Sequence, residues 1–573
     1  MAFAQLLESF RPTPESIPPS YPTYRRHHPK GLPVHIHPLD PVGFLLRGAQ
    51  IYPDQLAVVH PDVPKPVAYT YAVWTQRVQN LAYALIEAGI KPGDTVACIA
   101  PNSPMIADAH HGVLAARAIL CPINTRLTKA DVDYIIDHSQ AKLILIDWEY
   151  EHLIKGTKLP TIVCQDTGRY GDPYEAFLSS GRKFSQERGW GGLVAEANED
   201  AGSMLCYTSG TTGRPKGVIT TLRSSYLAAI ANASETQMTR ESTYLWILPM
   251  FHAAGWTYPW AITFSQATQI TLRAIQFPLI WNHLLNSGVT HYCGAPTVQI
   301  GLVNAPQCRP LPRKVTAIVA GSAPTAHLIG QLEKIGINPV HVYGLTETLG
   351  PFTKNYYQPS WAKLSHEERS KLRARQGHSF NTAEEARVIE PIPEDVKGHV
   401  EPVDVPRDGK TVGEIVTHGN IVMKEYFRDP AATKKAFRGG HFNSGDLAVW
   451  YPDGSIAVVD RSKDIIISGG ENASSLAIEQ ELSEHPDILE VSVVARPHIK
   501  WGERPMAFVV LRHDGEKKWA GRLDEFAADL KKHAKKRLPG FACPEWVDVV
   551  QELPKTSTGK ILKTQLRKIV AKL

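Results

Sequence analysis

Residues 207–218 read YTSGTTGRPKGV, a stretch with almost nothing apolar to bury. Seven of its twelve residues are Thr, Ser or Gly, and its only charges are the basic Arg214 and Lys216. Free backbone N–H groups, hydroxyls and a basic side chain suit a phosphate chain. A Walker A loop needs Gly, four residues and then Gly-Lys-Ser/Thr, whereas here Gly217 follows the lysine. The stretch therefore predicts a phosphate loop of another kind, with small or hydroxyl-bearing residues and one lysine: Thr208, Ser209, Gly210, Thr211, Thr212, Gly213 and Lys216.

Length and composition set wide bounds around this loop. A chain of 573 residues exceeds what one core usually supports, so at least two domains are expected. The formal net charge of +5 is small for this length and gives no reason to expect a nucleic-acid partner. The seven cysteines are scattered without C-x-x-C spacing, which predicts reduced thiols rather than disulfides or a zinc site. No apolar run approaches the ~18 residues of a membrane span, and the first residues lack the pattern of a secretory leader.

The pattern along the chain predicts an α/β fold. From about Ala57 onward, short apolar runs that suit buried strands alternate with helical patterns such as 81–86 and 225–231. This alternation predicts βαβ units with parallel sheets, and binding sites just beyond the carboxyl ends of the strands. The candidate strands are residues 95–100, 143–146, 244–248 and 315–320.

Changes in this pattern predict three segments. Residues 1–43 are an arm whose segment 11–41 is rich in Pro and His, residues 44–461 are a large domain, and residues 462–573 are a small α+β domain. In the large domain, 361–376 is expected to be a charged helical insertion, and 452–454 a turn between strands 447–450 and 456–459. The small domain is expected to contain a helix at 475–484, strands at 491–495 and 507–511, and a helix with Leu523, Phe526 and Leu530 on one face.

The chain ends in Ala571-Lys572-Leu573. A terminal S-K-L is an address read by the peroxisomal import receptor, and A-K-L has the same small, basic and leucine character. The alternative is that these residues are the frayed end of a basic helix, LRKIVAKL. We therefore expect a peroxisomal location, with the cytoplasm as the alternative.

Five motifs occur in a telling order: YTSGTTGRPKG, VYGLTET, NSGD, DRSKDIIISGGEN and PKTSTGK. From about residue 40 to its end, the chain resembles the adenylate-forming superfamily of acyl-CoA synthetases, luciferases and peptide-synthetase adenylation domains. LPMFHAAGWTYPW, CGAP and SGGENASS are similar to peroxisomal short-chain acyl- and benzoate-type CoA ligases of plants and fungi. The resemblance implies a large domain of mixed and parallel sheets flanked by helices, and a small mobile α+β domain. It also implies that a carboxylate attacks the α-phosphate of Mg-ATP, releasing pyrophosphate, and that the thiol of coenzyme A then displaces AMP.

The resemblance assigns roles to residues of the ATP site. The loop at 208–213 and Lys216 would hold the β- and γ-phosphates. Thr346 would contact the α-phosphate, and the neighbouring Glu347 would hold Mg²⁺, which prefers oxygen ligands; an isolated TET would instead indicate a helix N-cap. Asp446 and Arg461 would bind the ribose. The residues that would enclose or adjoin the adenine are Gly321, Ser322, Ala323, Pro324, Tyr343 and Gly344.

The small domain would supply catalysis and the coenzyme A contacts. Lys560 resembles the lysine that acts in adenylation, and Lys463 aligns with the hinge about which the small domain rotates. The coenzyme A contacts would be Ser468, Gly469, Gly470 and Trp501. Two departures stand out: the usual Tyr-Thr-Gly-Asp becomes NSGD, and the usual basic residue near Cys543 is missing. Residues 531–537 (KKHAKKR) could replace it, although such a run is also typical of a solvated helix face.

The nature of the acid is left open. His252, Gly255, Trp256 and Gly294 are candidates for the acyl pocket, but Trp256 and Trp260 equally suit core aromatics. His252 stands where amino-acid-activating domains have an Asp, which disfavours an amino-acid substrate, so short, medium and aromatic acids remain. The alternatives to an acyl-CoA ligase are a luciferase-like oxygenase and a non-enzymatic nucleotide-binding protein. A serine hydrolase is excluded because Ser209 lacks the G-x-S-x-G turn.

Overall fold

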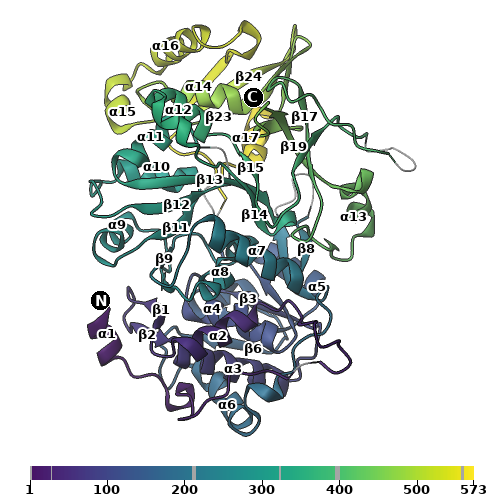
Figure 1. Ribbon diagram of the computed structural model, residues 1–573. Helices are drawn as coiled ribbons and strands as arrows, with labels where there is room; N and C mark the ends of the chain where they lie inside the picture. The colour runs from purple at the N-terminus through teal and green to yellow at the C-terminus, as the bar shows by residue number, and fades with distance from the viewer. Residues whose placement is uncertain (1–2, 28, 209–213, 322–323, 394–399, 557–559) are drawn as a thin grey trace.

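The computed structural model describes residues 3–27, 29–208, 214–321, 324–393, 400–556 and 560–573. The chain builds upward in Figure 1, from a lower lobe (purple and blue) through a middle layer (teal) to a C-terminal unit (yellow). None of the described helices has the length and apolar character needed to cross a bilayer. All seven cysteines are described and carry free thiols, as predicted.

The lower lobe is organised around a sheet of seven strands in the described part of the chain. β3 to β7 pair in parallel, and β8 and β18 are added antiparallel at one edge. All five residues of β3 are buried, as expected for a parallel strand covered on both faces. In spatial order the strands are β18 (Glu425–Tyr426), β8 (Lys216–Thr221), β7 (Gly202–Thr208), β4 (Ile119–Pro122), β3 (Thr95–Ile99), β5 (Ala141–Asp147) and β6 (Thr161–Cys164).

The middle layer contains a sheet in which nine strands are described. Its six central strands, from β13 to β1, are parallel, and its edges are antiparallel. In spatial order the strands are β15 (His378–Ser379), β14 (Gly350–Lys354), β13 (Ile337–Leu345), β12 (Val315–Val319), β11 (His291–Gly294), β9 (Thr243–Trp246), β10 (Thr268–Thr271), β1 (Leu56–His60) and β2 (Val67–Thr70).

Two smaller sheets complete the described fold. One is a sheet of four antiparallel strands. In spatial order they are β16 (Arg387–Ile389), β17 (Val412–Thr417), β19 (Phe442–Trp450) and β20 (Ile456–Arg461). The C-terminal unit has a five-stranded sheet, in which β25 joins β24 in parallel. Its strands are β22 (Glu471–Ala473), β21 (Ile466–Ser468), β24 (Gly502–Leu511), β23 (Ile488–His498) and β25 (Trp546–Val549).

Helices fill the space between the sheets and cover their outer faces (Figure 1). One buried cluster includes Val96 and Cys98 of β3 and Tyr244 and Trp246 of β9, so the two large sheets share a core. The described α-helices are α1 (Ala4–Ser9), α2 (Val42–Ile51), α3 (Tyr71–Glu87), α4 (Pro104–Ala115), α5 (Lys129–Ser139), α6 (Pro173–Arg188), α7 (Leu222–Glu235), α8 (Tyr258–Phe264), α9 (Phe277–Asn286), α10 (Pro296–Asn304), α11 (Ala326–Lys334), α12 (His366–Arg373), α13 (Pro430–Ala436), α14 (Ser475–Ser483), α15 (His513–Trp519), α16 (Leu523–Lys535) and α17 (Lys563–Val570).

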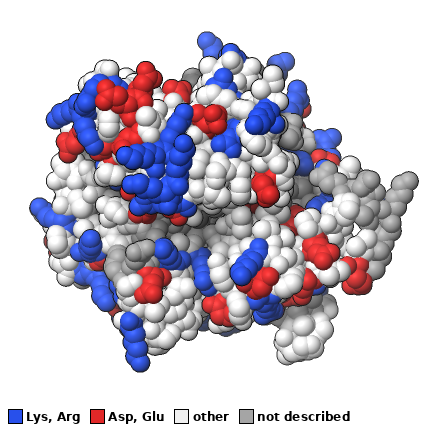
Figure 2. Space-filling view, turned by 90° about the horizontal axis from the view of Figure 1, so that it is seen from above, with Lys and Arg blue, Asp and Glu red and all other residues white. Residues whose placement is uncertain are grey.

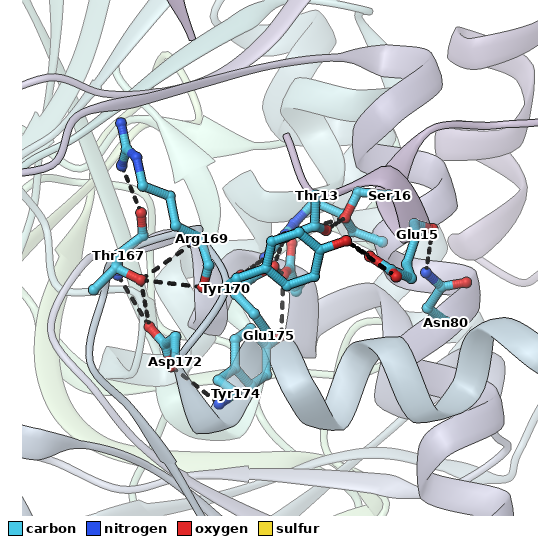
Figure 3. A network of polar contacts seen from close by, with 12 residues as sticks. Thr13, Glu15, Ser16, Asn80, Thr167, Arg169, Tyr170, Asp172, Tyr174 and Glu175 are labelled. Atoms are coloured by element: carbon cyan, nitrogen blue, oxygen red, sulfur yellow. Dashed lines mark hydrogen bonds and ion pairs between the residues drawn. The ribbon is translucent and has the colours of Figure 1, made fainter. Parts of the chain in front are cut away.

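Polar contacts join the N-terminal segment to the lower lobe beside a buried charge network (Figure 3). The guanidinium of Arg77 in α3 donates to both carboxylate oxygens of Glu175 in α6, at 2.7 and 2.8 Å, and to Asp108 at 3.1 Å. Burial raises the pKa of Asp108 to about 6, against the opposing effect of Arg77. Asn80 donates to the carbonyl oxygen of Glu15 at 2.8 Å, and the Tyr170 hydroxyl donates to the Glu15 carboxylate at 2.9 Å. The arm is thus fixed by polar contacts to α3 and to the loop before α6.

The predicted α/β class, with mixed and parallel sheets flanked by helices, is confirmed, and the structure refines two local predictions. The helical insertion expected over 361–376 consists of a 3-10 turn at Pro359–Lys363 and an α-helix at His366–Arg373, which Ser365 caps. Leu523, Phe526 and Leu530 lie in one helix, as predicted, but Leu523 is 46% exposed while Phe526 and Leu530 are fully buried. Leu523 is the first residue of α16 and therefore lies at the solvent end of the helix.

Candidate active site

The carboxyl end of β13 brings together residues from distant parts of the chain. The hydroxyl of Tyr343 donates to Oδ2 of Asp446 at 2.7 Å, and Nε of Arg461 lies 3.1 Å from Oδ1 of the same carboxylate. Asp446 in β19 and Arg461 in β20 are direct partners across an antiparallel pair. The charge of Asp446 raises the pKa of Arg461. The structure therefore places the predicted adenine residue Tyr343 beside both predicted ribose residues.

Tyr426 was not predicted from the sequence. It links Glu347, the predicted metal ligand, to the β7–β8 hairpin that carries the predicted phosphate loop (the phosphate hairpin). Its hydroxyl donates to Oε1 of Glu347 at 2.8 Å. The ammonium of Lys216 lies 4.7 Å from the centre of the Tyr426 ring, a cation–π contact. β18 pairs with β8, and the Met423 N–H donates to the Glu347 carbonyl at 2.7 Å, which fixes this geometry. Nothing in the local sequence KEYFRDP distinguishes Tyr426, because its partners come from other elements.

The phosphate hairpin lies partly outside the described residues. Thr208 ends β7 and is paired with Lys216, the first residue of β8. Thr346 heads the 3-10 turn Thr346–Thr348, which follows β13 directly. Gly321, with φ of +93°, and the buried Pro324 both follow the end of β12. The predicted residues outside the described part are Ser209, Gly210, Thr211, Thr212, Gly213, Ser322 and Ala323.

Lys560 lies within electrostatic reach of the nucleotide residues. Burial, reinforced by Arg461, lowers the pKa of Lys560 to about 8, and Asp446 opposes this shift. Burial also lowers the pKa of His252 to about 4, with a further contribution from the Lys560 ammonium. A lysine from the end of the chain thus interacts electrostatically with Asp446, Arg461 and His252. This is the arrangement needed to offset negative charge between a nucleotide phosphate and a bound carboxylate.

The segment that follows His252 has an unusual backbone. The 3-10 turn His252–Thr257 contains Gly255 with φ of +60° and Trp256 with φ of +52°, and an aromatic residue seldom adopts a positive φ. Asn232 of α7 holds this turn, since its amide donates to the Trp256 carbonyl at 3.2 Å and to the Thr257 hydroxyl at 2.9 Å. Such strain persists only where the surroundings fix it, and it is typical of functional sites.

Close packing ties this turn to the end of β13. Trp256 is 6% exposed and Trp260 is fully buried, so both are in the core. A Cβ on Gly344 would lie 1.9 Å from the Gly350 carbonyl oxygen, and one on Gly350 would lie 3.1 Å from Cα of Trp256. Glycine is therefore required at 344 by backbone packing. Gly294 ends β11, and a Cβ there would lie 3.0 Å from the Gln299 amide nitrogen.

The predicted coenzyme A residues lie together where β21 ends and β24 begins in the C-terminal sheet. Ser468 is buried, and Trp501 is 43% exposed. The Gly469 N–H donates to the Trp501 carbonyl at 2.8 Å, and a Cβ on Gly469 would lie 2.8 Å from the Trp501 ring. Gly469 (φ +64°) and Gly470 (φ +88°) both occupy conformations that favour glycine. Trp501 therefore accounts for glycine at 469 independently of any substrate.

Arg504 occupies the neighbourhood of the missing basic residue. Its guanidinium donates to the Ser468 hydroxyl at 3.1 Å and to the carbonyls of Phe541 at 2.9 Å and Cys543 at 3.1 Å. It therefore joins Ser468 of β21 to the segment 541–543, near which the usual basic residue is missing. The alternative basic run, 531–537, covers the last turn of α16 and the two residues after it. Its exposed basic residues are Lys532, Lys535, Lys536 and Arg537. Figure 2 shows Lys and Arg side chains gathered on this end of the molecule.

The predicted hinge residue is exposed between two anchored segments. The N–H groups of Asp464 and Ile465 donate to the Arg461 carbonyl, at 2.9 and 3.2 Å. The guanidinium of Arg567 in α17 forms an ion pair with Asp464 and donates to the Lys463 carbonyl at 3.3 Å. Partial desolvation, followed by the charge of Arg461, lowers the pKa of Lys463. Lys463 is thus held through its backbone, while its side chain lies at the surface.

Comparison with known sequences identifies the family. Residues 45–427 match the profile described as AMP-binding enzyme, and residues 477–560 match that of the AMP-binding enzyme C-terminal domain. The chain belongs to the AMP-binding enzyme family. It is 38% identical over 563 residues to a peroxisomal acetate/butyrate–CoA ligase of Arabidopsis thaliana, covering 94% of this chain and 95% of that one. It is 35% identical to a peroxisomal benzoate–CoA ligase of the same plant, with 93% of each chain covered.

Solved structures share the fold. ATP-bound MatB from Rhodopseudomonas palustris superposes with a TM-score of 0.78 at 23% identity, covering 93% of this chain and 99% of that one. A benzoate CoA ligase from Burkholderia xenovorans LB400 gives a TM-score of 0.77 at 21% identity, covering 92% and 99%. The superfamily resemblance found in the motifs, and the closer likeness to plant peroxisomal ligases, are confirmed.

Proposed function

We propose that this AMP-binding enzyme is an ATP-dependent acyl-CoA ligase that forms an acyl-adenylate and then the thioester. The observation that carries this proposal is the direct contact of Tyr343 and Arg461 with Asp446 at the end of β13, where the charges of Arg461 and Asp446 also act on Lys560. The Lys560 ammonium would neutralise charge as the acid's carboxylate attacks the α-phosphate. Removing one such preorganised contact typically costs about 3–4 kcal/mol of transition-state stabilisation. The CoA ligase names of its relatives, which align over more than nine-tenths of the chain, support the same reaction.

The nucleotide would be held between β13 and the β19–β20 pair. Asp446 would accept hydrogen bonds from the ribose, with Arg461 beside it and Tyr343 packed against the adenine. Thr346 would contact the α-phosphate, while Lys216 and the loop before it would hold the phosphates that leave. Aligned donors and a cation at this edge would stabilise the charge that develops on them.

The described residues suit a magnesium ion that would be bound mainly by the phosphates of ATP, with one carboxylate from the protein. They contain no cluster of three His, Cys, Asp or Glu side chains able to form a protein-only metal site. Mg²⁺ commonly binds through one or two carboxylates and the phosphates of a nucleotide. Glu347, oriented by Tyr426, would be that carboxylate. Bound Mg²⁺ would supply charge neutralisation on the phosphates.

The second half-reaction would require the C-terminal unit to turn. We propose a boundary near 461, with 44–461 as the large domain and 462–573 as the small one, pivoting at Lys463. The turn would withdraw Lys560 and bring Ser468, Gly469 and Gly470 to the acyl-adenylate as a passage for the thiol arm of coenzyme A. Trp501, exposed beside Gly469, would contact its nucleotide, and the basic run 531–537 would supply charge for its phosphates.

The substrate we propose is a short or aromatic monocarboxylic acid. The relatives include ligases named for acetate, butyrate and benzoate. His252, Gly255, Trp256 and Gly294 would line the acyl pocket, with the buried Trp256 limiting its depth. A location in the peroxisome is supported by the peroxisomal names of the relatives and by the exposed terminal residues Ala571, Lys572 and Leu573, which an import receptor could reach.

A panel of carboxylic acids, assayed for AMP formation that depends on coenzyme A, tests this function. We expect activity with at least one short or aromatic acid, and we expect Lys560→Ala to lower adenylate formation by at least about 100-fold. Thioester formation from a supplied acyl-adenylate should be spared in this variant. Oxygen uptake or light emission without thioester would favour a luciferase-like oxygenase instead.

A further inference from the structure

A carboxylate at the end of β20 caps a helix of the C-terminal unit. Oδ2 of Asp460 accepts hydrogen bonds from the backbone N–H of Ser475 at 2.6 Å and from the Ser475 hydroxyl at 2.7 Å. The N–H of Leu476 is a third, longer donor at 3.4 Å. These groups belong to the first turn of α14, a nine-residue helix. Asp460 is 5% exposed and Ser475 is fully buried, so water competes little for these bonds.

Charge makes this cap strong. A carboxylate at a helix N-terminus meets the positive end of the helix dipole, and hydrogen bonds to an ionised acceptor are about twice as strong as neutral ones. The other oxygen, Oδ1, accepts the N–H of Arg461 at 2.8 Å, which fixes the carboxylate relative to β20. Asp460 is therefore held by its own strand while it binds the first turn of α14.

The cap connects segments on either side of the proposed hinge. Asp460 precedes Lys463 in the chain, whereas Ser475 follows it. Next to the cap, the Ser474 hydroxyl donates to the Val459 carbonyl at 2.7 Å. If the small domain pivots at Lys463, β20 stays with the large domain and α14 leaves, so all these bonds must break. The cap can form only in one orientation of the small domain.

Ser475 also contacts the segment that carries Lys560. The Lys563 ammonium donates to the Ser475 hydroxyl at 2.6 Å and lies 2.8 Å from Glu479 in α14. Lys563 is the first residue of α17, just beyond Lys560. The start of α14 therefore carries both the cap and the anchor of the segment that presents Lys560.

We propose that Asp460 is a positioning residue, which holds the small domain in the orientation where Lys560 reaches the nucleotide site. The inference rests on the proposed function, because it assigns the cap to the adenylation half of that reaction. Loss of the cap lowers the fraction of molecules in this orientation, which adenylation requires. Asp460 itself makes no contact with substrate. The thioester half-reaction, which requires the other orientation, does not need the cap.

The first test measures the two half-reactions separately in Asp460→Ala. We expect single-turnover pyrophosphate release to slow by roughly tenfold to a hundredfold, the range for lost hydrogen bonds to a charged group. Thioester formation from a supplied acyl-adenylate should be unchanged or faster. Ser475→Ala, which keeps the backbone donors, should show a smaller loss of the same kind. The matched control is Asp487→Asn, which loses charge opposite Lys518 and Trp519 within the C-terminal unit and should leave both half-reactions unchanged.

A tether separates positioning from damage to the fold. The Arg512 guanidinium of the C-terminal unit donates to Asn304 of α10 at 2.8 Å, so these two positions face each other in the orientation described. Cysteines at both positions, joined by a short bifunctional thiol reagent, would hold that orientation without the cap. We expect the tether to restore pyrophosphate release to Asp460→Ala, measured with thermal stability to confirm folding.

Three outcomes would overturn the inference. An equal fall in both half-reactions, or a tethered Asp460→Ala enzyme as slow as the untethered one, would mean that Asp460 supports the fold and does not position Lys560. Unchanged pyrophosphate release in Asp460→Ala would mean that the cap has no part in adenylation. Failure of the proposed function appears differently, because the wild-type chain would then form no thioester from any acid in the panel.

Discussion

Raising the pH from 7 to 9 should slow adenylation because Lys560 loses its proton over this range. Burial and the neighbouring Arg461 lower its pKa to about 8, whereas an unperturbed lysine titrates near 10.4. With a pKa of about 8, roughly nine-tenths of Lys560 is protonated at pH 7 and roughly one-tenth at pH 9. If only the ammonium form supports the reaction, the rate constant for free enzyme and ATP should fall about tenfold over this range.

The assay follows pyrophosphate release at subsaturating ATP, because kcat/KM reports the pKa values of the free enzyme. At saturating ATP the bound phosphates favour the charged lysine, so the fall in kcat should move to higher pH. Lys560→Arg is the control, since arginine stays protonated throughout, and its residual activity should lack this fall. A wild-type kcat/KM that stays level from pH 7 to 9 would refute the assignment of Lys560 as the group that must be charged.

Four further changes test other parts of the structure. Tyr426→Phe removes the hydroxyl that orients Glu347 and should raise the Mg²⁺ concentration for half-maximal activity by about 10-fold or more, the usual cost of losing a partner of a metal ligand. Trp256→Gly should shift preference toward longer acids, because each added methylene gains about 0.8 kcal/mol of burial and two carbons change kcat/KM ratios by roughly tenfold. Arg77→Met leaves two carboxylates buried without their cation and should lower the free energy of unfolding by about 3–5 kcal/mol, measured by denaturant titration. Deleting residues 571–573 should leave catalysis intact while a fluorescently tagged protein stays outside peroxisomes.

Each of these results has a clear opposite. An unchanged Mg²⁺ requirement would remove Tyr426 from the metal site. If Trp256→Gly lowered activity on every acid alike together with thermal stability, Trp256 would be a core residue only. Stability unaffected by Arg77→Met would mean that the carboxylates take up protons without cost. A truncated protein that still enters peroxisomes would show that the address lies elsewhere.

The sequence by itself determined the class of fold and the family. A fully buried strand such as β3 appears as a continuous apolar run, and the motifs around Lys216, Glu347, Asp446 and Lys560 are recognisable one by one. Both signals are local, because burial on two faces and the chemistry of a loop are recorded in consecutive residues. Element ends were less accessible: the start of α12 depends on the cap at Ser365.

Only the tertiary structure decided which side chains meet. Tyr343 and Asp446 are 103 residues apart in the chain yet lie 2.7 Å from each other, and Tyr426 reaches Glu347 across 79 residues. Asp460 stands next to Arg461 in a recognised motif, but its role as a cap depends on where α14 packs. Spacing along a chain constrains neighbours within a helix or strand, whereas contacts between elements depend on how whole sheets and helices bury their apolar faces against one another.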